Sequence, residues 1–257
     1  MKLATYNVNG IRARLPRLVE WLDRETPDIV CLQELKCADE ALPIADIEAA
    51  GYGAVWHGQK GFNGVAILAR GKEPALRLTG LPGDPDDSHS RYIEAEVGDL
   101  IVASLYLPNG NPVGTEKFDY KLRWMKRLGE RAAELLALER PVVLAGDWNV
   151  IPDDRDVFSA TAVQHDALIQ PESRAAWRRI MAQGWTDALR AFHPADPKLY
   201  TFWDYTAGAW QRDAGFRIDH LLCSPEAADG LTCAGVDRWA RGEEKASDHA
   251  PTWVELS

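Results

Sequence analysis

The sequence predicts an α/β fold, a four-layered α/β sandwich in which two packed mixed β-sheets are flanked by helices. Two observations support this class: strands and helices alternate along the 257 residues, and some neighbouring strands form hairpins while others are separated by a helix. Hairpins produce antiparallel pairs and helical crossovers produce parallel pairs, so both together indicate mixed sheets covered by helices. Because no low-complexity segment or Ser/Gly linker interrupts the pattern, we expect a single domain over residues 1–257.

The first half of the chain supplies mainly strands. Residues 2–7 (KLATYN) are the first expected strand, and a helix follows at 15–25, where Leu15, Leu18 and Leu22 share one face. Apolar runs then predict strands at 27–34, 91–97 and 100–109, and a hairpin around a glycine-rich turn at 53–70.

The second half contains the longest expected helix, at 115–140. Its apolar residues recur every three to four positions, at Phe118, Leu122, Met125, Leu128, Ala132 and Leu135. A buried strand follows at 141–149 and a second helix at 172–184. The last strands are expected at 217–224 and 251–257.

The composition limits the function classes. The formal charge of −10 and the pI of about 5.1 argue against a general nucleic-acid binder, which needs many Lys and Arg side chains for phosphate contacts. This argument is weak, however, because a divalent cation bound at an acidic site reverses the local electrostatic potential from negative to positive.

Targeting signals and cysteine pairing are not expected. The chain has no run near the roughly 20 apolar residues that span a bilayer, and its first residues do not resemble a signal peptide. The four cysteines show no CxxC spacing, and Cys31 and Cys223 lie in apolar runs. We therefore expect a cytoplasmic protein with reduced thiols and no membrane association.

Polar side chains recur at the ends of the expected strands. Each one could simply cap a turn, which is the usual role of a polar residue at such a position. The residues concerned are Asn7, Glu34, Tyr106, Asn109, Asp147, Asn149, Asp219, Asp248 and His249.

Taken together, these residues predict a metal site. Several strand ends of a layered α/β protein open on one edge, and carboxylates gathered there would repel one another unless a cation lay between them. Oxygen ligands favour Mg²⁺ or Mn²⁺ over zinc. Spacing alone leaves open whether the residues converge.

At these residues the chain closely resembles the exonuclease III family of apurinic/apyrimidinic (AP) endonucleases, within the endonuclease/exonuclease/phosphatase superfamily. The similar segments run in the family's order over nearly the whole chain. They are NVNGIRAR, PDIVCLQELK, HGQKGFNGVAIL, SLYLPNG, GDWNV, GWTDALR, YTFWDY, FRIDHLLCS and SDHAP.

The resemblance implies a Mg²⁺-dependent DNA repair phosphodiesterase, with Mn²⁺ able to substitute. Such an enzyme cleaves double-stranded DNA 5′ to abasic sites, degrades it as a 3′–5′ exodeoxyribonuclease and clears blocked 3′ ends. We expect it to act as a monomer.

The resemblance also implies roles for individual residues. Glu34 is the principal metal ligand, with Asn7 and Asp248 close to the ion and Asp147, Asn149 and His249 completing the metal site. Asp147 activates the attacking water, and His249 pairs with Asp219. Tyr106, Asn109 and Asn149 hold the phosphate. A Tyr106 phenolate is the alternative nucleophile or base, but we favour Asp147 because a carboxylate is already ionised at pH 7.

A further set of residues is implied for substrate binding. The resemblance places Phe202, Trp203, Phe216 and Ile218 around a pocket for a flipped-out sugar without a base, a steric filter that excludes an intact base. Without the resemblance, Phe202 and Trp203 would be read as core. The chain departs from some relatives at Asn9, Asn109 and Phe216, which leaves the metal stoichiometry and the balance of activities open.

DNA contacts are expected from local basic residues. Arg12, Arg14 and Arg17 follow Asn7, and Lys36, Lys60 and Arg91 lie in loops near strand ends. Lys117 and Lys121 share one face of the long helix, where a solvated surface is favoured over a DNA contact.

Two other functions are compatible with the fold class. The superfamily includes inositol-lipid phosphatases, sphingomyelinases and deadenylases, although YTFWDY and HGQKGFNGVAIL favour the DNA-repair branch. A non-catalytic binding module is the other alternative, but such a module would normally have lost at least one of five residues, and all five are present. These are Glu34, Asp147, Asp219, Asp248 and His249.

Overall fold

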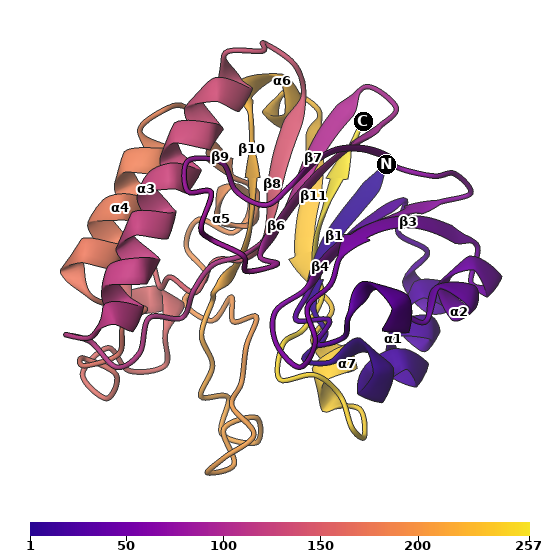
Figure 1. Ribbon diagram of the computed structural model, residues 1–257. Helices are drawn as coiled ribbons and strands as arrows, with labels where there is room; N and C mark the ends of the chain where they lie inside the picture. Colours follow the sequence, from indigo (N-terminus) through magenta and orange to yellow (C-terminus); the bar gives the residue numbers. More distant parts are fainter.

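Two six-stranded β-sheets pack face to face in the computed structural model, which describes residues 1–257 (Figure 1). Helices cover the outer face of each sheet, so the molecule has four layers. This arrangement confirms the predicted sandwich class.

The first sheet has the strand order β11-β12-β1-β2-β4-β3. Only β1 and β2 are parallel, and the other neighbours are antiparallel. The strands are β1 (Lys2–Asn7), β2 (Ile29–Gln33), β3 (Tyr52–His57), β4 (Val65–Arg70), β11 (Leu231–Val236) and β12 (Thr252–Leu256).

The second sheet repeats this design with the order β5-β6-β7-β8-β10-β9. Its single parallel pair is β7 with β8. The strands are β5 (Ala75–Thr79), β6 (Tyr92–Val97), β7 (Leu100–Tyr106), β8 (Val142–Asp147), β9 (Thr186–Asp187) and β10 (Asp219–Cys223). Each sheet therefore brings the carboxyl ends of two parallel strands to one edge.

The helices divide between the two outer faces. Figure 1 shows α1 (Ile11–Glu25), α2 (Ile44–Ala49) and α7 (Arg238–Gly242) beside the first sheet, and α3 (Glu116–Leu136) and α4 (Pro171–Met181) beside the second. Short elements complete the chain: α5 (Ala188–Phe192), α6 (Pro225–Ala228) and the 3₁₀ turns at Asp39–Ala41 and Asp154–Asp156. None of the helices combines the length and the apolar character that crossing a bilayer requires.

Three apolar layers hold the sandwich together. A cluster of 22 buried residues fills the space between the sheets, and clusters of 20 and 18 lie under α3 and α4 and under α1, respectively. Because both faces of each sheet are covered, every residue of β2 and β8 is buried. This explains their nearly continuous apolar sequences.

Several elements differ from the sequence prediction. The first helix begins at Ile11, not at 15, and Leu15 is only half-buried while Ile11, Leu18 and Trp21 form its buried face. Strands β5, β9 and β11 and the short helices were not predicted. β5 is a largely exposed strand at the edge of its sheet, so it lacks the apolar signal on which prediction depends.

The cysteines are free, as expected from their spacing. Cys31, Cys37 and Cys223 are buried and Cys233 is half-buried. Burial raises the pKa of the Cys31 and Cys223 thiols, which therefore stay protonated as core side chains.

Candidate active site and metal centre

The polar strand ends of the two sheets meet in one place. Asn7 ends β1, Glu34 follows β2, and Asp147 ends β8 in the facing sheet. The amide Nδ2 of Asn7 donates to Oε1 of Glu34 at 3.0 Å and to Oδ2 of Asp147 at 2.9 Å. One amide thus joins carboxylates from both sheets, so these three strand ends converge, which their spacing in the sequence left open.

Backbone conformation turns these side chains out of the strands. Glu34 and Asn149 have φ values of 55° and 46°, in the left-handed region that non-glycine residues seldom adopt. Asn149 is held there by its own N–H, which donates to Oδ1 of Asp147 at 3.0 Å. Such strained positions concentrate at functional sites, where the surrounding structure maintains them.

Register within the second sheet aligns two more residues with Asp147. Asp147 pairs with Tyr106 of β7 on one side and with Asp219 of β10 on the other. Nδ1 of His249 lies 2.8 Å from Oδ2 of Asp219, and its Nε2 lies 3.8 Å from Oδ2 of Asp147. The imidazole therefore stands between two buried carboxylates.

The charges of this group are strongly coupled. Burial alone would lower the pKa of His249, but the negative charge and hydrogen bond of Asp219 raise it above the ordinary histidine value. Burial, followed by repulsion from Asp219 and Glu34, raises the pKa of Asp147, whereas His249 opposes this rise. The carboxylates of the site therefore repel one another, and burial adds to the free-energy cost of keeping them all ionised.

Glu34 and Tyr106 differ in their ionisation. Burial would raise the pKa of Glu34, but hydrogen bonds from Asn7 and Lys36 lower it below the ordinary glutamate value. Burial and the charges of Glu34 and Asp147 raise the pKa of Tyr106 far above that of free tyrosine. The phenol therefore remains a hydrogen-bond donor.

The donor set fits a hard divalent cation. Asp147, Asp219 and His249 place potential ligand atoms within 4.8 Å of one another. The side-chain amide of Asn7 donates to both Glu34 and Asp147 and so holds these two carboxylates near each other. Oδ1 of Asp219 is buried without a hydrogen-bond partner. Such unpaired oxygen atoms suit Mg²⁺ or Mn²⁺ better than a thiolate-bound metal.

Asp248 belongs to the outer part of the site. Its Oδ1 accepts a hydrogen bond of 3.0 Å from Nδ2 of Asn9, the position at which the chain departs from some relatives. Oδ1 of Asn9 in turn accepts from Lys36, whose ammonium lies 2.7 Å from Oε2 of Glu34. Asn9 and Lys36 therefore connect Asp248 to Glu34.

Most of the predicted site residues line a cavity of about 280 Å³, but Asn7 and Asp219 are not part of its lining. The lining combines polar side chains with apolar ones, including Leu168, which sequence reasoning missed. Asp166 and Asp204 were missed as well: Asp166 lies in a segment without a recognisable pattern, and Asp204 lies in YTFWDY, where only the aromatic residues were assigned a role. The complete lining is Glu34, Tyr106, Asn109, Asp147, Asn149, Asp166, Leu168, Phe202, Asp204, Phe216, Ile218, Asp248 and His249.

The structure corrects the prediction for Trp203. This side chain is fully buried and packs edge to face against Tyr200 and Trp210, and it does not line the cavity. Phe202 and Trp203 are adjacent in an extended segment, so they point in opposite directions. Phe202 faces His249 with ring centroids 4.9 Å apart, whereas Trp203 supports the segment from behind.

Arg91 lies beside the cavity and not in its wall. Its guanidinium stacks over the Tyr106 ring at 4.7 Å, and its Nη1 donates to the Tyr106 carbonyl at 3.1 Å. The Nε atom of Arg91 is buried without a partner.

Lys121 also differs from its predicted place. Lys117 is exposed, as expected for a solvated helix face, but Lys121 is fully buried. Burial lowers the pKa of Lys121 to about 7, although the charges of Asp147 and Asp166 oppose this shift. The side chain can therefore neither face solvent nor contact DNA.

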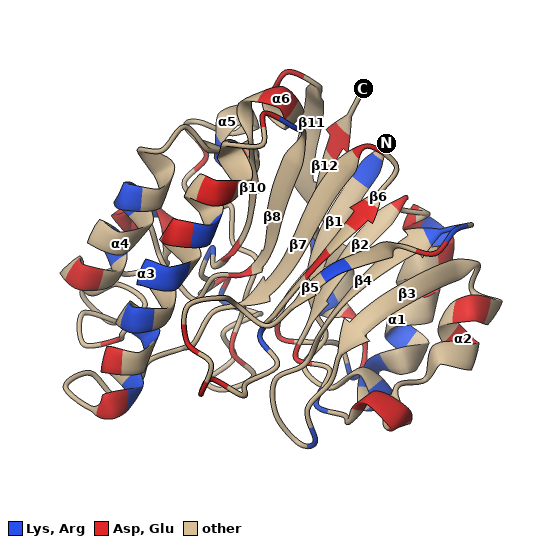
Figure 2. Ribbon diagram, turned by 45° about the horizontal axis from the view of Figure 1, so that its top comes forward, with Lys and Arg blue, Asp and Glu red and all other residues tan.

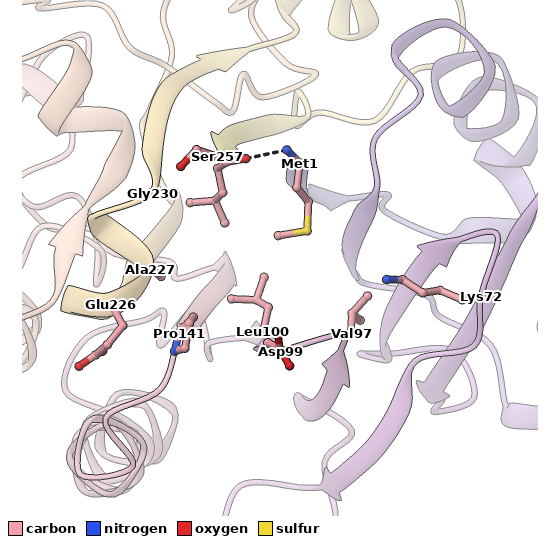
Figure 3. A pocket seen from close by; sticks show the side chains of 12 residues that line it. Met1, Lys72, Val97, Asp99, Leu100, Pro141, Glu226, Ala227, Gly230 and Ser257 are labelled. Carbon is pink, nitrogen blue, oxygen red and sulfur yellow. Dashed lines mark hydrogen bonds between the residues drawn. The ribbon is translucent and has the colours of Figure 1, made fainter.

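A second cavity, of about 340 Å³, lies at the opposite strand ends (Figure 3). It is bordered by the chain termini and by the β6–β7 turn at 97–100. Glu226 and Lys72 are among its few charged residues, and they do not form an ion pair. This cavity lacks the convergent polar groups of the strand-end site.

The fold and this oxygen-rich strand-end site are those of a phosphoesterase sandwich. The chain belongs to the endonuclease/exonuclease/phosphatase family, which it matches over residues 4–249. Within that family it belongs to the exonuclease III group, because it is 34% identical over its full length to exodeoxyribonuclease III of Haemophilus influenzae, all of which is covered.

Other relatives agree with this placement. The DNA repair nuclease APEX1 of Danio rerio is 33% identical, with all of this chain and 82% of the zebrafish protein covered. An AP endonuclease from Archaeoglobus fulgidus superposes with a TM-score of 0.95 at 36% identity, covering 100% and 99% of the two chains. The 3′–5′ exonuclease NExo from Neisseria meningitidis superposes at 0.96 with 37% identity and full coverage of both chains.

Proposed function

We propose that this protein is a divalent-metal-dependent DNA repair nuclease that cleaves 5′ to abasic sites, degrades DNA from 3′ ends and clears blocked 3′ termini. The observation that carries the proposal is the shared contact of Asn7 with Glu34 and Asp147 beside the Asp219–His249 pair. The names of its relatives support the same activities. They include a Neisseria 3′ phosphatase solved bound to a product DNA hairpin, at 36% identity and a TM-score of 0.96.

Asp147 is the proposed base for the attacking water. It is buried next to His249, Asn7 links it to Glu34, and its carboxylate lines the cavity, where it can accept a proton from a water molecule. Tyr106 is the weaker candidate, since its phenol would have to lose its proton beside two carboxylates. Tyr106 instead acts as a hydrogen-bond donor.

The phosphate is held by donors fixed before the substrate arrives. Asn149, Asn109, Tyr106 and the protonated His249 line the cavity and can stabilise the charge that develops on the phosphate oxygens. Asp219 keeps the imidazole oriented through its 2.8 Å contact with Nδ1. Arg91, beside Tyr106, adds a positive charge.

The proposed metal is Mg²⁺, with Mn²⁺ able to substitute. Glu34 is the principal ligand, and Asn7, Asp147, Asn149 and Asp248 complete the set available to it; His249 joins this set only in its neutral form. When bound, such an ion offsets the repulsion among these carboxylates and polarises the phosphate.

The apolar wall supports selectivity for a sugar without a base. Phe202, Phe216 and Ile218 lie beside the phosphate-binding groups, and the volume of about 280 Å³ suits a small group. A deoxyribose can enter, whereas an attached base would meet the aromatic rings.

DNA contacts would come from loops around the site. Figure 2 shows acidic and basic residues mixed along α3 and α4, and not a continuous basic face. Arg12 and Lys60 are exposed in loops or helix starts near the strand ends. We infer that the whole chain acts as one cytoplasmic nuclease domain and as a monomer.

One gel tests the proposed function. A 5′-labelled duplex with a single abasic site is incubated with the protein in the presence or absence of Mg²⁺. We expect an internal nick at the abasic site and laddering from the 3′ end, both dependent on Mg²⁺. A protein that cleaves neither this duplex nor a 3′-phosphate end would contradict the proposal.

A further inference from the structure

Lys121 is a fully buried lysine beside the active-site loops. Its ammonium donates to the carbonyl oxygens of Pro108 at 3.1 Å, Asn109 at 3.2 Å and Asn149 at 2.6 Å. In its protonated form a lysine has three N–H donors, and this environment satisfies all of them. No carboxylate lies within ion-pair distance of Lys121.

This arrangement is energetically unusual. Removing an ammonium group from water costs several kcal/mol, and a buried charge is normally paired with an opposite charge. Around Lys121, three neutral carbonyl groups surround the ammonium instead of a carboxylate. A leucine or methionine would fill the same space without this cost, so packing alone does not account for a lysine.

The three carbonyl groups come from the two loops that carry the phosphate-binding amides. Pro108 and Asn109 follow β7, and Asn149 follows β8. Nδ2 of Asn109 donates to Oδ1 of Asn149 at 3.2 Å, and Nδ2 of Asn149 donates to the Leu107 carbonyl at 2.9 Å. Lys121 thus lies behind the backbone whose side chains line the cavity.

The loop is shaped around the lysine stem. Gly110 has a φ of +89°, and a Cβ atom added there would lie 2.6 Å from Cδ of Lys121. A side chain at position 110 would therefore displace the lysine. Close packing on one side and three hydrogen bonds on the other leave the ammonium a single position.

We propose that Lys121 is a positioning residue that fixes the spacing of the Asn109 and Asn149 amides by joining the backbone of their two loops. This inference rests on the proposed function, in which both amides hold the phosphate. Lys121 does not touch the substrate. It acts by keeping the donors where the transition-state oxygens will be, and a misplacement of about 1 Å can cost on the order of 10²-fold in rate.

The main test is Lys121→Met, which keeps the volume and removes the charge and donors. Lys117→Met is the matched control, because Lys117 is exposed one turn earlier on the same helix. On the abasic duplex we expect Lys121→Met to lower kcat by roughly 10²-fold with KM changed less than about 3-fold. The control should stay within about 2-fold of wild type.

A double-mutant cycle separates positioning from a general loss of structure. If Lys121 acts through Asn149, then Lys121→Met combined with Asn149→Ala should be hardly slower than Asn149→Ala alone. Combined with Phe216→Ala, on the apolar wall, the two effects should multiply. Wild-type kcat in Lys121→Met, or effects that multiply equally with both partners, would overturn the proposal.

Side-chain amide NMR gives a readout that does not depend on the proposed activity. Lys121→Met should shift the Asn109 and Asn149 side-chain amide signals, and Lys117→Met should not. If Lys121→Met fails to fold, Lys121→Gln and Gly110→Ala, which displaces the lysine, serve in its place. Unchanged amide signals in the folded variants would refute the positioning role even if the wild type proved inactive on abasic DNA.

Discussion

Nδ1 of His249 lies 2.8 Å from Oδ2 of Asp219, and the other carboxylate oxygen of Asp219 is buried without a partner. The pair comes from two sheets, because Asp219 begins β10 and His249 precedes β12. This contact directs the opposite ring nitrogen towards Asp147 at 3.8 Å. The orientation of one imidazole is thus set by the packing of both sheets.

Replacing His249 by Asn or Asp147 by Asn should nearly abolish cleavage while leaving the protein folded. Each change removes a group that stabilises or activates the reacting atoms, and such losses typically cost roughly 10²–10³ in rate. The measurement is nicking of an abasic duplex, with circular dichroism to check the fold. His193→Asn is the control and should keep wild-type activity, because the His193 ring forms a hydrogen bond with the Ala234 carbonyl and does not line the cavity. Activity of His249→Asn or Asp147→Asn within a few-fold of wild type would count against these roles.

Phe216→Ala should weaken discrimination against intact nucleotides. The ring forms part of the apolar wall of the cavity and stacks near Phe158, with centroids 6.1 Å apart. Its removal opens space for a base, so the ratio of abasic to intact cleavage should fall. Phe192→Ala, at an exposed position on α5, is the control. An unchanged ratio of abasic to intact cleavage would show that Phe216 does not exclude intact nucleotides from the cavity.

Removal of divalent cations should stop cleavage without unfolding the protein. The carboxylates of the site need a counter-charge for catalysis, whereas the core that holds them consists of apolar clusters elsewhere. EDTA should therefore abolish nicking, and Mg²⁺ or Mn²⁺ should restore it, with the far-ultraviolet circular dichroism unchanged throughout. Full activity in EDTA would be incompatible with the proposed metal centre.

Asp156→Asn should destabilise the fold strongly. Arg217 is buried and donates from Nε to Oδ1 of Asp156 at 2.8 Å and from Nη1 to Oδ2 of Asp187 at 2.7 Å. Breaking a buried ion pair by removing one partner costs about 3–5 kcal/mol. Urea unfolding measures the free energy of unfolding, and Asp23→Asn, at an exposed position on α1, is the control. A decrease in unfolding free energy of less than about 1 kcal/mol would contradict this prediction, because it would be no larger than the contribution of an exposed ion pair.

The same aspartate predicts a pH dependence of stability. Burial would raise the pKa of Asp156, but the hydrogen bonds and charge of Arg217 lower it below the ordinary value. Its stabilising contribution is therefore complete above the unfolded pKa of about 3.9 and is lost as pH falls through the lower folded value. The difference in unfolding free energy between wild type and Asp156→Asn should stay constant from neutral to mildly acidic pH and shrink below about pH 4. A difference that grows in acid would contradict this sign.

Much of the site could be predicted because its signals are local. A polar pair such as Asp147 and Asn149, at the end of an apolar strand, is visible in ten residues of sequence, and the resemblance placed such pairs in one family. The same holds for the fold class, since β2, β8 and α3 carry strong apolar patterns. Weak or exposed elements such as β5 left no such signal.

The sequence by itself determined the types of residue at the strand ends, the apolar patterns that define both sheets, and the family. Only the tertiary structure decided which of them meet: Asn7 joins Glu34 to Asp147, Trp203 turns into the core, and Lys121 lies buried behind Asn109 and Asn149. The physical reason is that the spacing of apolar residues along the chain indicates only which face of its own helix or strand a residue occupies. The partner across that face depends on how two sheets pack, which brings together residues more than a hundred positions apart.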